Sequence, residues 1–159
     1  MWLNGRAADL LAKFISMVEL NPKQKGNLTE VKCLSAFYEL GYKCSIPYGE
    51  NSRYDLIADI DGKLIRVQCK TSREVDEGVI AFPCRSSRSN THSNLQRRYT
   101  ANEIDYFCTF WDGKCYLIPV TECSIIKILR FVPPKNGQKV GITYAKDYEL
   151  QGQLEKLKG

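Results

Sequence analysis

The feature that most constrains this chain is the stretch 53–70, which reads R-Y-D-L-I-A-D-I-D-G-K-L-I-R-V-Q-C-K. The Asp61-Gly62 dipeptide in its middle is typical of a type I′ hairpin turn, because both central positions of that turn need positive φ. The residues on either side alternate in polarity, as paired strands require. The stretch therefore predicts a β-hairpin with a fixed register. The register pairs Ile60 with Lys63, Ala58 with Ile65, and Asp55 with Gln68.

The pleat of such a hairpin sorts the side chains onto two faces. The apolar face holds Tyr54, Leu56, Ala58, Ile60, Ile65, Val67 and Cys69. The other face holds Asp55, Ile57, Asp59, Arg66, Gln68 and Lys70. A carboxylate, an amide and an ammonium group therefore meet at the end of the hairpin farthest from its turn. Two interpretations stay open, namely a solvated face of an ordinary strand pair and a site for a metal ion and a phosphate.

Three segments taken together resemble the PD-(D/E)XK nuclease superfamily, whose core is shared by type II restriction enzymes and Holliday-junction resolvases. They are Lys25-Gly26-x3-Glu30, Arg53-Tyr54-Asp55 and Val67-Gln68-Cys69-Lys70-Thr71. The pattern is most similar to that of small intron-encoded homing endonucleases, which carry Gln-x-Lys where most relatives carry Glu-x-Lys. The similarity covers Lys25 to Pro119 and returns weakly at Lys135-Asn136. Two positions depart from the common pattern: Tyr54-Asp55 replaces Pro-Asp, and the neutral Gln68 replaces an acid.

The resemblance implies an α/β, restriction-endonuclease-like core with a mixed central sheet flanked by helices. It also implies a metal-dependent endonuclease that uses Mg²⁺, with Mn²⁺ as a candidate substitute. In that family pattern Asp55 is the main metal ligand, and the backbone carbonyl of Cys69 is another. Glu30 would bind through water or hold a second ion, and Lys70 would orient the attacking water. Gln68 can offer an amide oxygen but brings no charge.

The function that follows is site-specific cutting of double-stranded DNA by a homing-type endonuclease. One site cuts one strand, so a double-strand cutter built from this chain would be a homo-oligomer, a tetramer or a dimer. Alternatives are a Holliday-junction resolvase or repair nuclease, and a DNA-binding module that has lost catalysis, which the uncharged Gln68 would allow. A regulatory or structural protein is a further alternative.

A net charge of +5 permits an acidic partner without demanding one. The span 78–102 contains no acidic residue, and its middle predicts a polar surface loop. Such a loop is either simply solvated or in contact with DNA phosphates and groove edges. The residues expected to bind DNA are Arg85, Arg88, Arg97 and Arg98, to which the resemblance adds Lys135 and Asn136.

At 159 residues the chain is expected to form one domain. We expect an amino-terminal helix within 1–20, a nuclease core over 25–120 and a carboxy-terminal extension over 121–159. The core should begin with a helix over 23–40 that ends at Gly41 and has Glu30 beside its apolar stripe. That stripe is predicted to consist of Leu28, Val31, Leu34, Phe37 and Tyr38. Strands are expected at 42–48 and at 78–83, the latter within an open sheet, and a hairpin at 104–120.

The seven cysteines favour neither disulfides nor zinc, because their number is odd, no C-x-x-C pair occurs and His92 is the sole histidine. We expect them to be reduced thiols that act as small apolar side chains. No segment has the roughly 20 apolar residues that span a bilayer. Asp9, Lys13 and Glu19 interrupt any signal-peptide pattern, so an intracellular, cytoplasmic location without membrane contact is expected.

Overall fold

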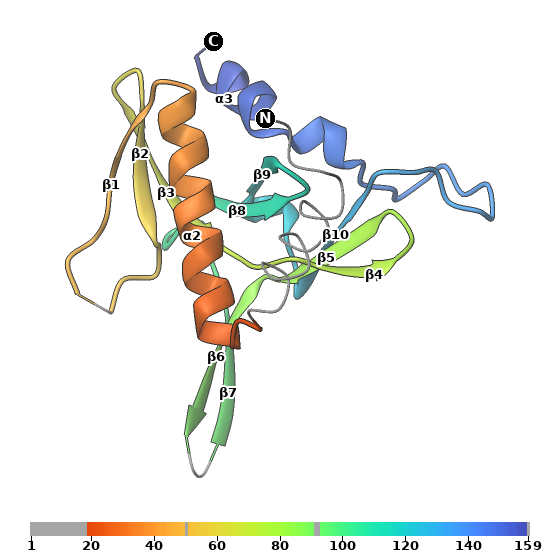
Figure 1. The fold of residues 1–159 in the computed structure, drawn as a ribbon, viewed down its shortest axis with the longest axis horizontal. Helices are drawn as coiled ribbons and strands as arrows, with labels where there is room; N and C mark the ends of the chain where they lie inside the picture. The colour runs from red at the N-terminus through yellow and green to blue at the C-terminus, as the bar shows by residue number, and fades with distance from the viewer. Residues whose placement is uncertain (1–18, 50, 91–92, 159) are drawn as a thin grey trace, which may run out of the picture.

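The computed structural model describes residues 19–49, 51–90 and 93–158, and it describes side chains throughout these ranges except at 87–95. The amino-terminal helix predicted within 1–20 lies outside the described residues except at 19 and 20. Within the described ranges, the fold consists of two β-sheets, a long helix, a short carboxy-terminal helix and a projecting hairpin (Figure 1).

The central sheet has five strands in the order β1-β2-β3-β8-β9. Strands β3 and β8 run parallel, whereas the other neighbours run antiparallel, so the predicted mixed sheet is confirmed. The strands are β1 (Lys43–Ser45), β2 (Leu56–Ile60), β3 (Lys63–Cys69), β8 (Tyr106–Trp111) and β9 (Lys114–Pro119).

Two tight turns fix the register of this sheet. Asp61 and Gly62 have φ values of 53° and 92°, so β2 and β3 pair as predicted, with Ala58 opposite Ile65. Asp112-Gly113 turns β8 into β9 in the same way, with φ values of 46° and 80°. The predicted apolar face of the first hairpin is buried from Leu56 to Cys69, which confirms the face assignment.

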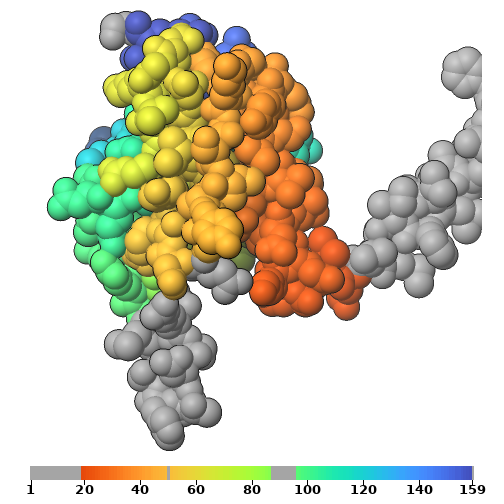
Figure 2. Space-filling model, turned by 90° about the vertical axis from the view of Figure 1, so that its left-hand side faces the viewer, coloured from red at the N-terminus to blue at the C-terminus, as the bar shows by residue number. Residues whose placement is uncertain are grey.

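Helix α2 (Pro22–Glu39) covers the apolar face of the sheet. Asn21 caps its start through a capping box with Gln24. At its end Gly41 has a φ of 85°, and the Tyr42 amide donates to the Phe37 carbonyl, as in a Schellman motif. Figure 2 shows α2 (orange to red) alongside the β2–β3 region (yellow).

The predicted apolar stripe of α2 is correct for Phe37, which is buried, and for Leu34, which packs against the core, but it is wrong for the other three residues. Leu28, Val31 and Tyr38 are 41%, 61% and 54% exposed, whereas Thr29, Cys33 and Phe37 are buried. The helix is rotated because its first turns dock through a hydroxyl pair between Thr29 and a threonine that follows β3. Farther along the helix, Cys33 and Phe37 enter the core.

A second sheet, in the order β10-β5-β4, packs on the opposite face of the central sheet. Its strands are β4 (Arg73–Asp76), β5 (Val79–Pro83) and β10 (Ile126–Arg130). Ile80, Phe82 and Leu129 of this sheet share a core with Phe107 and Ile118. The expected fourth strand is therefore β5, but the expectation that it extends one open sheet is wrong. The apolar side chains of 79–82 require a buried site, and a separate sheet provides it.

Strands β6 (Arg85–Asn90) and β7 (Ser93–Arg98) form a two-stranded antiparallel hairpin that projects away from both sheets (Figure 1). The prediction of a polar loop here is wrong, because backbone hydrogen bonding pairs the strands although their side chains are mostly polar. Its register places Arg85 opposite Arg98 and Ser86 opposite Arg97.

The carboxy-terminal segment forms η1 (Val120–Glu122), β10, η2 (Ala145–Tyr148) and α3 (Leu150–Leu157). Leu150 and Leu154 belong to the core under α2, and Leu129 and Ala145 belong to the core between the sheets. The segment expected as an extension thus completes both cores. In the ranges that the structure describes, no helix combines the length and apolarity needed to cross a bilayer.

Candidate active site

Asp55 is the residue just before β2, and both its backbone and its side chain form hydrogen bonds with β3. Its backbone N–H donates to the Val67 carbonyl at 2.9 Å, and its Oδ2 accepts the Cys69 backbone N–H at 2.7 Å. Burial raises the pKa of Asp55 to about 6; the charge of Glu30 adds to this rise, while the Cys69 N–H and Lys70 oppose it. A carboxylate so placed is desolvated next to another acid, which is an unfavourable state unless a cation compensates.

Gln68 and Cys69 lie directly across from Asp55. The Gln68 side chain is buried, and its Nε2 donates to the Cys69 carbonyl at 3.3 Å. That contact leaves the Oε1 atom of Gln68 and a second lone pair on the Cys69 carbonyl as acceptors. Gln68 is more buried than the open-sheet prediction implies, because it shares its face with Phe107, a member of the core between the sheets.

Glu30 is brought to this site by the docking of α2. The hydroxyls of Thr29 and Thr71 lie 2.9 Å apart, and Thr29 Oγ1 also donates to the Lys25 carbonyl at 3.0 Å. The start of the helix is thereby fixed against the end of β3. Burial raises the pKa of Glu30, and its charge in turn raises the pKa of Asp55, so the two acids are electrostatic neighbours.

Lys70 follows β3 and joins the β2–β3 hairpin to the β6–β7 hairpin. Its Nζ donates to the Arg85 carbonyl at 3.2 Å and to the Tyr99 hydroxyl at 3.4 Å, and it lies 4.9 Å from the centre of the Tyr99 ring. Burial lowers the pKa of Lys70, while the charge of Asp55 opposes that shift. The ammonium group is therefore partly desolvated and held in one direction.

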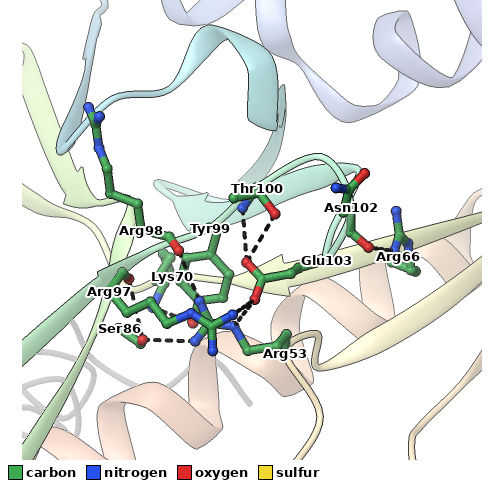
Figure 3. A network of polar contacts seen from close by, with 10 residues as sticks. All are labelled: Arg53, Arg66, Lys70, Ser86, Arg97, Arg98, Tyr99, Thr100, Asn102 and Glu103. Carbon is green, nitrogen blue, oxygen red and sulfur yellow. Dashed lines mark hydrogen bonds and ion pairs between the residues drawn. The ribbon is translucent and has the colours of Figure 1, made fainter.

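Arg53 organises a polar network at the base of the β6–β7 hairpin (Figure 3). Its guanidinium donates to Glu103 Oε1 at 3.1 Å, to Ser86 Oγ at 2.8 Å and to the Arg98 carbonyl at 3.2 Å. It also lies 4.0 Å from the centre of the Tyr99 ring, the same ring that Lys70 contacts. One arginine, two positions before Asp55, thus fixes the β6–β7 hairpin to the segment that leads into β2.

Glu103 is the acidic centre of this network and accepts contacts from Arg53, Arg97 and the Thr100 backbone N–H. Burial opposes its ionisation, but the Thr100 N–H and the two arginines together hold the pKa of Glu103 below its usual value. Sequence reasoning assigned no role to Arg53, Tyr99 or Glu103. The signal for Glu103 was its position as the first acid after the acid-free span.

The four predicted DNA-contacting arginines all lie on the β6–β7 hairpin. Arg85, Arg97 and Arg98 are at its base, where Arg97 contacts Glu103 and the Arg98 guanidinium donates to Ser124. The backbone of Arg88 is nearer the tip, and its side chain is outside the described part of the chain.

Lys135 and Asn136 lie in the loop after β10, which Figure 1 shows away from the hairpin. Lys135 contacts Glu77 at 3.3 Å, and Asn136 accepts the Gln138 N–H at 3.1 Å. The structure therefore brings Asp55, Gln68, Cys69 and Lys70 together and leaves Lys135 and Asn136 elsewhere. Glu30 is an exposed residue of α2 that lies near enough for its charge to act on Asp55.

The donor atoms at the site fit a small hard cation. Carboxylates of Asp55 and Glu30, the Cys69 carbonyl and the Gln68 amide oxygen are the oxygen ligands that Mg²⁺ prefers. A divalent cation bound there would stabilise the ionised forms of both acids, which burial otherwise disfavours by raising the pKa of each.

Comparison with known proteins agrees with this geometry. A model of the PD-(D/E)XK endonuclease family matches residues 20–151. The chain therefore belongs to the PD-(D/E)XK endonuclease family. Its structure is similar to that of the bacterial homing endonuclease I-Ssp6803I, with a TM-score of 0.70 and 22% sequence identity over 88% of this chain and 96% of that one. No curated protein matches the chain. The superfamily resemblance and the α/β fold expected from the sequence are confirmed.

Proposed function

We propose that this endonuclease is a Mg²⁺-dependent, homing-type enzyme that cuts both strands of a specific DNA site. The observation that carries the proposal is the link between Asp55, Lys70 and the basic hairpin. Asp55 binds the backbone of Cys69, and the next residue, Lys70, binds the backbone of Arg85. The hydrolytic groups and the surface expected to bind DNA are therefore connected within a few residues. The similarity to the structure of a homing endonuclease supports the finer assignment.

The roles of the residues follow from what phosphodiester hydrolysis requires. A bound Mg²⁺ would neutralise developing charge and supply an activated water. Asp55 and the Cys69 carbonyl would hold the ion, with Glu30 contributing through water. Lys70 would orient the attacking water and offset the charge of the scissile phosphate, a role that its desolvated, directed ammonium suits. Gln68 would complete the ligand set without adding charge.

The β6–β7 hairpin supports the assignment of double-stranded DNA as substrate. A two-stranded β-ribbon is one of the elements that fit the major groove of B-DNA. Arginines at the base of the ribbon would contact phosphates, while its Ser, Asn and Gln side chains are of the kind that contact backbone and base edges. Cutting both strands of the DNA requires two active sites, so we infer a homo-oligomer, either a dimer or a tetramer.

The decisive experiment measures cleavage of a plasmid library carrying randomised sites, with Mg²⁺, with Mn²⁺ and with chelator. We expect linear products with either metal and none with chelator. Lys70→Ala should abolish cleavage, whereas Lys63→Ala, at the exposed turn end of the same strand, should cleave normally.

Four results would contradict all or part of the proposal. Binding of native protein to a selected site without cleavage under any metal would favour the inactive DNA-binding module. Preference for four-way junctions over linear duplex would favour a resolvase, and nicking without double-strand breaks would contradict the paired sites. Equal cleavage by Lys70→Ala would remove Lys70 from the mechanism.

A further inference from the structure

Three buried cysteines converge beneath α2, on the side of the central sheet away from the basic hairpin. The Sγ atoms of Cys33, Cys108 and Cys115 all lie within 4.8 Å of one another. Cys33 comes from α2, Cys108 from β8 and Cys115 from β9, and their exposed fractions are 0%, 0% and 5%. Cys108 and Cys115 face the same core from the two strands of the β8–β9 hairpin, and the packing of α2 on the sheet brings the distant Cys33 to them.

A fourth cysteine, Cys69, adjoins this group from β3. The parallel pairing of β3 and β8 places it directly opposite Cys108, and it belongs to the same buried core. The thiol of Cys33 and burial both raise the pKa of Cys69, so the two thiols are close neighbours. Four of the seven cysteines of the chain thus meet from four different elements of the fold.

The spacing of the sulfurs is near that of a thiolate metal site. Zinc bound by cysteine has Zn–S distances of about 2.3 Å, which puts two sulfurs of a tetrahedral site about 3.8 Å apart. The sulfurs of Cys33, Cys108 and Cys115, already within 4.8 Å of one another, need shifts of about 1 Å or less to reach that spacing, whereas Cys69 lies outside this group and would have to move farther to complete the site. Rotation of the thiol side chains can supply shifts of this size without moving the backbone.

The chemistry of the donors selects the ion. Sulfur donors without an imidazole or carboxylate favour Zn²⁺ and Cu⁺ over Mg²⁺ and Mn²⁺. Binding requires that the thiols lose their protons. Neighbouring thiols lower the pKa of Cys115, whereas neighbouring thiols and burial raise the pKa of Cys33, Cys69 and Cys108, so a bound ion would itself have to displace most of the protons. The Lys32 carbonyl accepts the Cys115 thiol, at 3.9 Å.

We propose that Cys33, Cys108 and Cys115, completed by Cys69, form a structural site for one soft metal ion, with Zn²⁺ as the expected occupant. The ion would tie α2 to three strands of the central sheet. It would lie behind the carboxylate site, because the backbone N–H of Cys69 holds Asp55 while the Cys69 thiol faces the other way. The wide spacing of these cysteines in the sequence does not exclude zinc, since the fold brings distant ligands together.

The test measures metal content and Co²⁺ binding on the intact protein. We expect protein purified without chelator to carry about one zinc per chain. After removal of that zinc, Co²⁺ should produce the sulfur-to-cobalt charge-transfer band and the visible bands of tetrahedral coordination. Cys108→Ser should lose zinc and both bands, whereas Cys123→Ser should keep them. Cys123 is the matched control, since it neighbours a different thiol, Cys84.

Two further measurements keep the proposal testable if Cys108→Ser fails to fold. Native protein that is folded, contains no zinc and gives no charge-transfer band with Co²⁺ would overturn it. Bands that vanish in Cys123→Ser but persist in Cys33→Ala would overturn it as well. Asp55→Asn should retain zinc and the cobalt bands, so failure of the carboxylate mechanism and failure of the thiolate site give different results.

Discussion

The two hairpins β2–β3 and β6–β7 are held in place by different kinds of interaction. In β2–β3 the side chains alternate, and the buried half, from Leu56 to Cys69, is at most 7% exposed. In β6–β7 no such alternation exists, and the described attachments are polar contacts at the base, through Arg53 and Lys70. The first hairpin is positioned by apolar burial, which tolerates little movement. The second is positioned by hydrogen bonds, which can be exchanged for contacts to a ligand.

Under the proposed function, this difference corresponds to two different roles. Chemistry needs groups held to fractions of an ångström, and the rigid hairpin carries Asp55 and Gln68. Binding to DNA needs exposed cations that can adapt to phosphates, and the polar hairpin carries the arginines. Changes in β2–β3 should therefore act on the chemical step, and changes in β6–β7 on binding and its salt dependence.

The largest effect is expected for Asp55→Asn, which removes the main candidate ligand from the rigid hairpin. Cleavage should fall by about 10³-fold or more, since metal-assisted hydrolysis depends on that ligand. DNA binding should persist, because the change also removes a negative charge facing phosphates. Gel-shift and single-turnover cleavage assays measure the two. Asp59→Asn, on the same face of β2 but beside the turn, is the control and should cleave normally. Near-native cleavage by Asp55→Asn would contradict the assignment.

The same residue predicts a pH dependence of stability in metal-free protein. A folded-state pKa near 6, above the ordinary 3.8, means that protonated Asp55 favours the folded state. Its contribution to the free energy of unfolding is present below about pH 4 and is lost as pH rises through about 6. At pH 7, Asp55→Asn should thus be more stable than native protein by up to about 3 kcal/mol. Urea unfolding with chelator, between pH 4.5 and 7.5, measures this, and equal stability at pH 7 would refute it.

Gln68 is the next test of the rigid hairpin, because it separates an active site from a degenerate one. Gln68→Ala should lose about 10- to 100-fold in cleavage, the usual cost of losing a group that supports a metal site. Gln68→Glu adds a charge near Asp55 and Glu30, so it should stay active with a lower Mg²⁺ requirement. It should also raise the pKa of one acid in metal-free protein. Cleavage by native protein and both variants is measured as a function of Mg²⁺ concentration. If native protein is inactive and Gln68→Glu restores cleavage, the native site is catalytically inactive.

Glu103→Gln tests the attachment between the two hairpins. It removes the negative charge that Arg53 and Arg97 share. We expect transition-state stabilisation to fall by about 1.4 kcal/mol, which would lower kcat/KM about tenfold. Backbone amides of β6 and β7 should exchange with deuterium faster, while those of β2 and β3 should not change. Glu155→Gln, an exposed acid on α3, is the control. Unchanged exchange in β6–β7 would show that the hairpin does not depend on Glu103.

The sequence predicts the elements whose local signals agree with their burial. Asp61-Gly62 and Asp112-Gly113 each sit between alternating or apolar runs, so turn chemistry and core burial specify the same hairpins. Gly41 likewise predicts the end of α2. Asp55, Gln68 and Lys70 could be placed on one face because a two-residue turn leaves one register.

What the sequence does not predict depends on contacts between distant segments. The rotation of α2 follows from Thr29 meeting Thr71, and nothing in the local pattern favours a buried threonine over Leu28. The β6–β7 hairpin lacks apolar alternation, so its strands have no periodic signal. The convergence of four cysteines depends on the parallel pairing of β3 with β8, a connection that passes through two intervening hairpins.

The smallest effect is expected at the base of the polar hairpin, in the double variant Arg97→Ala with Arg98→Ala. Each phosphate contact contributes about −0.9 to the slope of log affinity against log salt, so losing two would make the slope shallower by at most about 1.8. The change should be smaller than that, because Glu103 already shares the charge of Arg97. Cleavage at saturating DNA should stay near native, since β2–β3 is untouched. Lys114→Ala with Lys156→Ala removes two cations from β9 and α3 and should leave the slope unchanged. An unchanged slope in the arginine variant would assign Arg97 and Arg98 to protein contacts with Glu103 and Ser124 rather than to DNA.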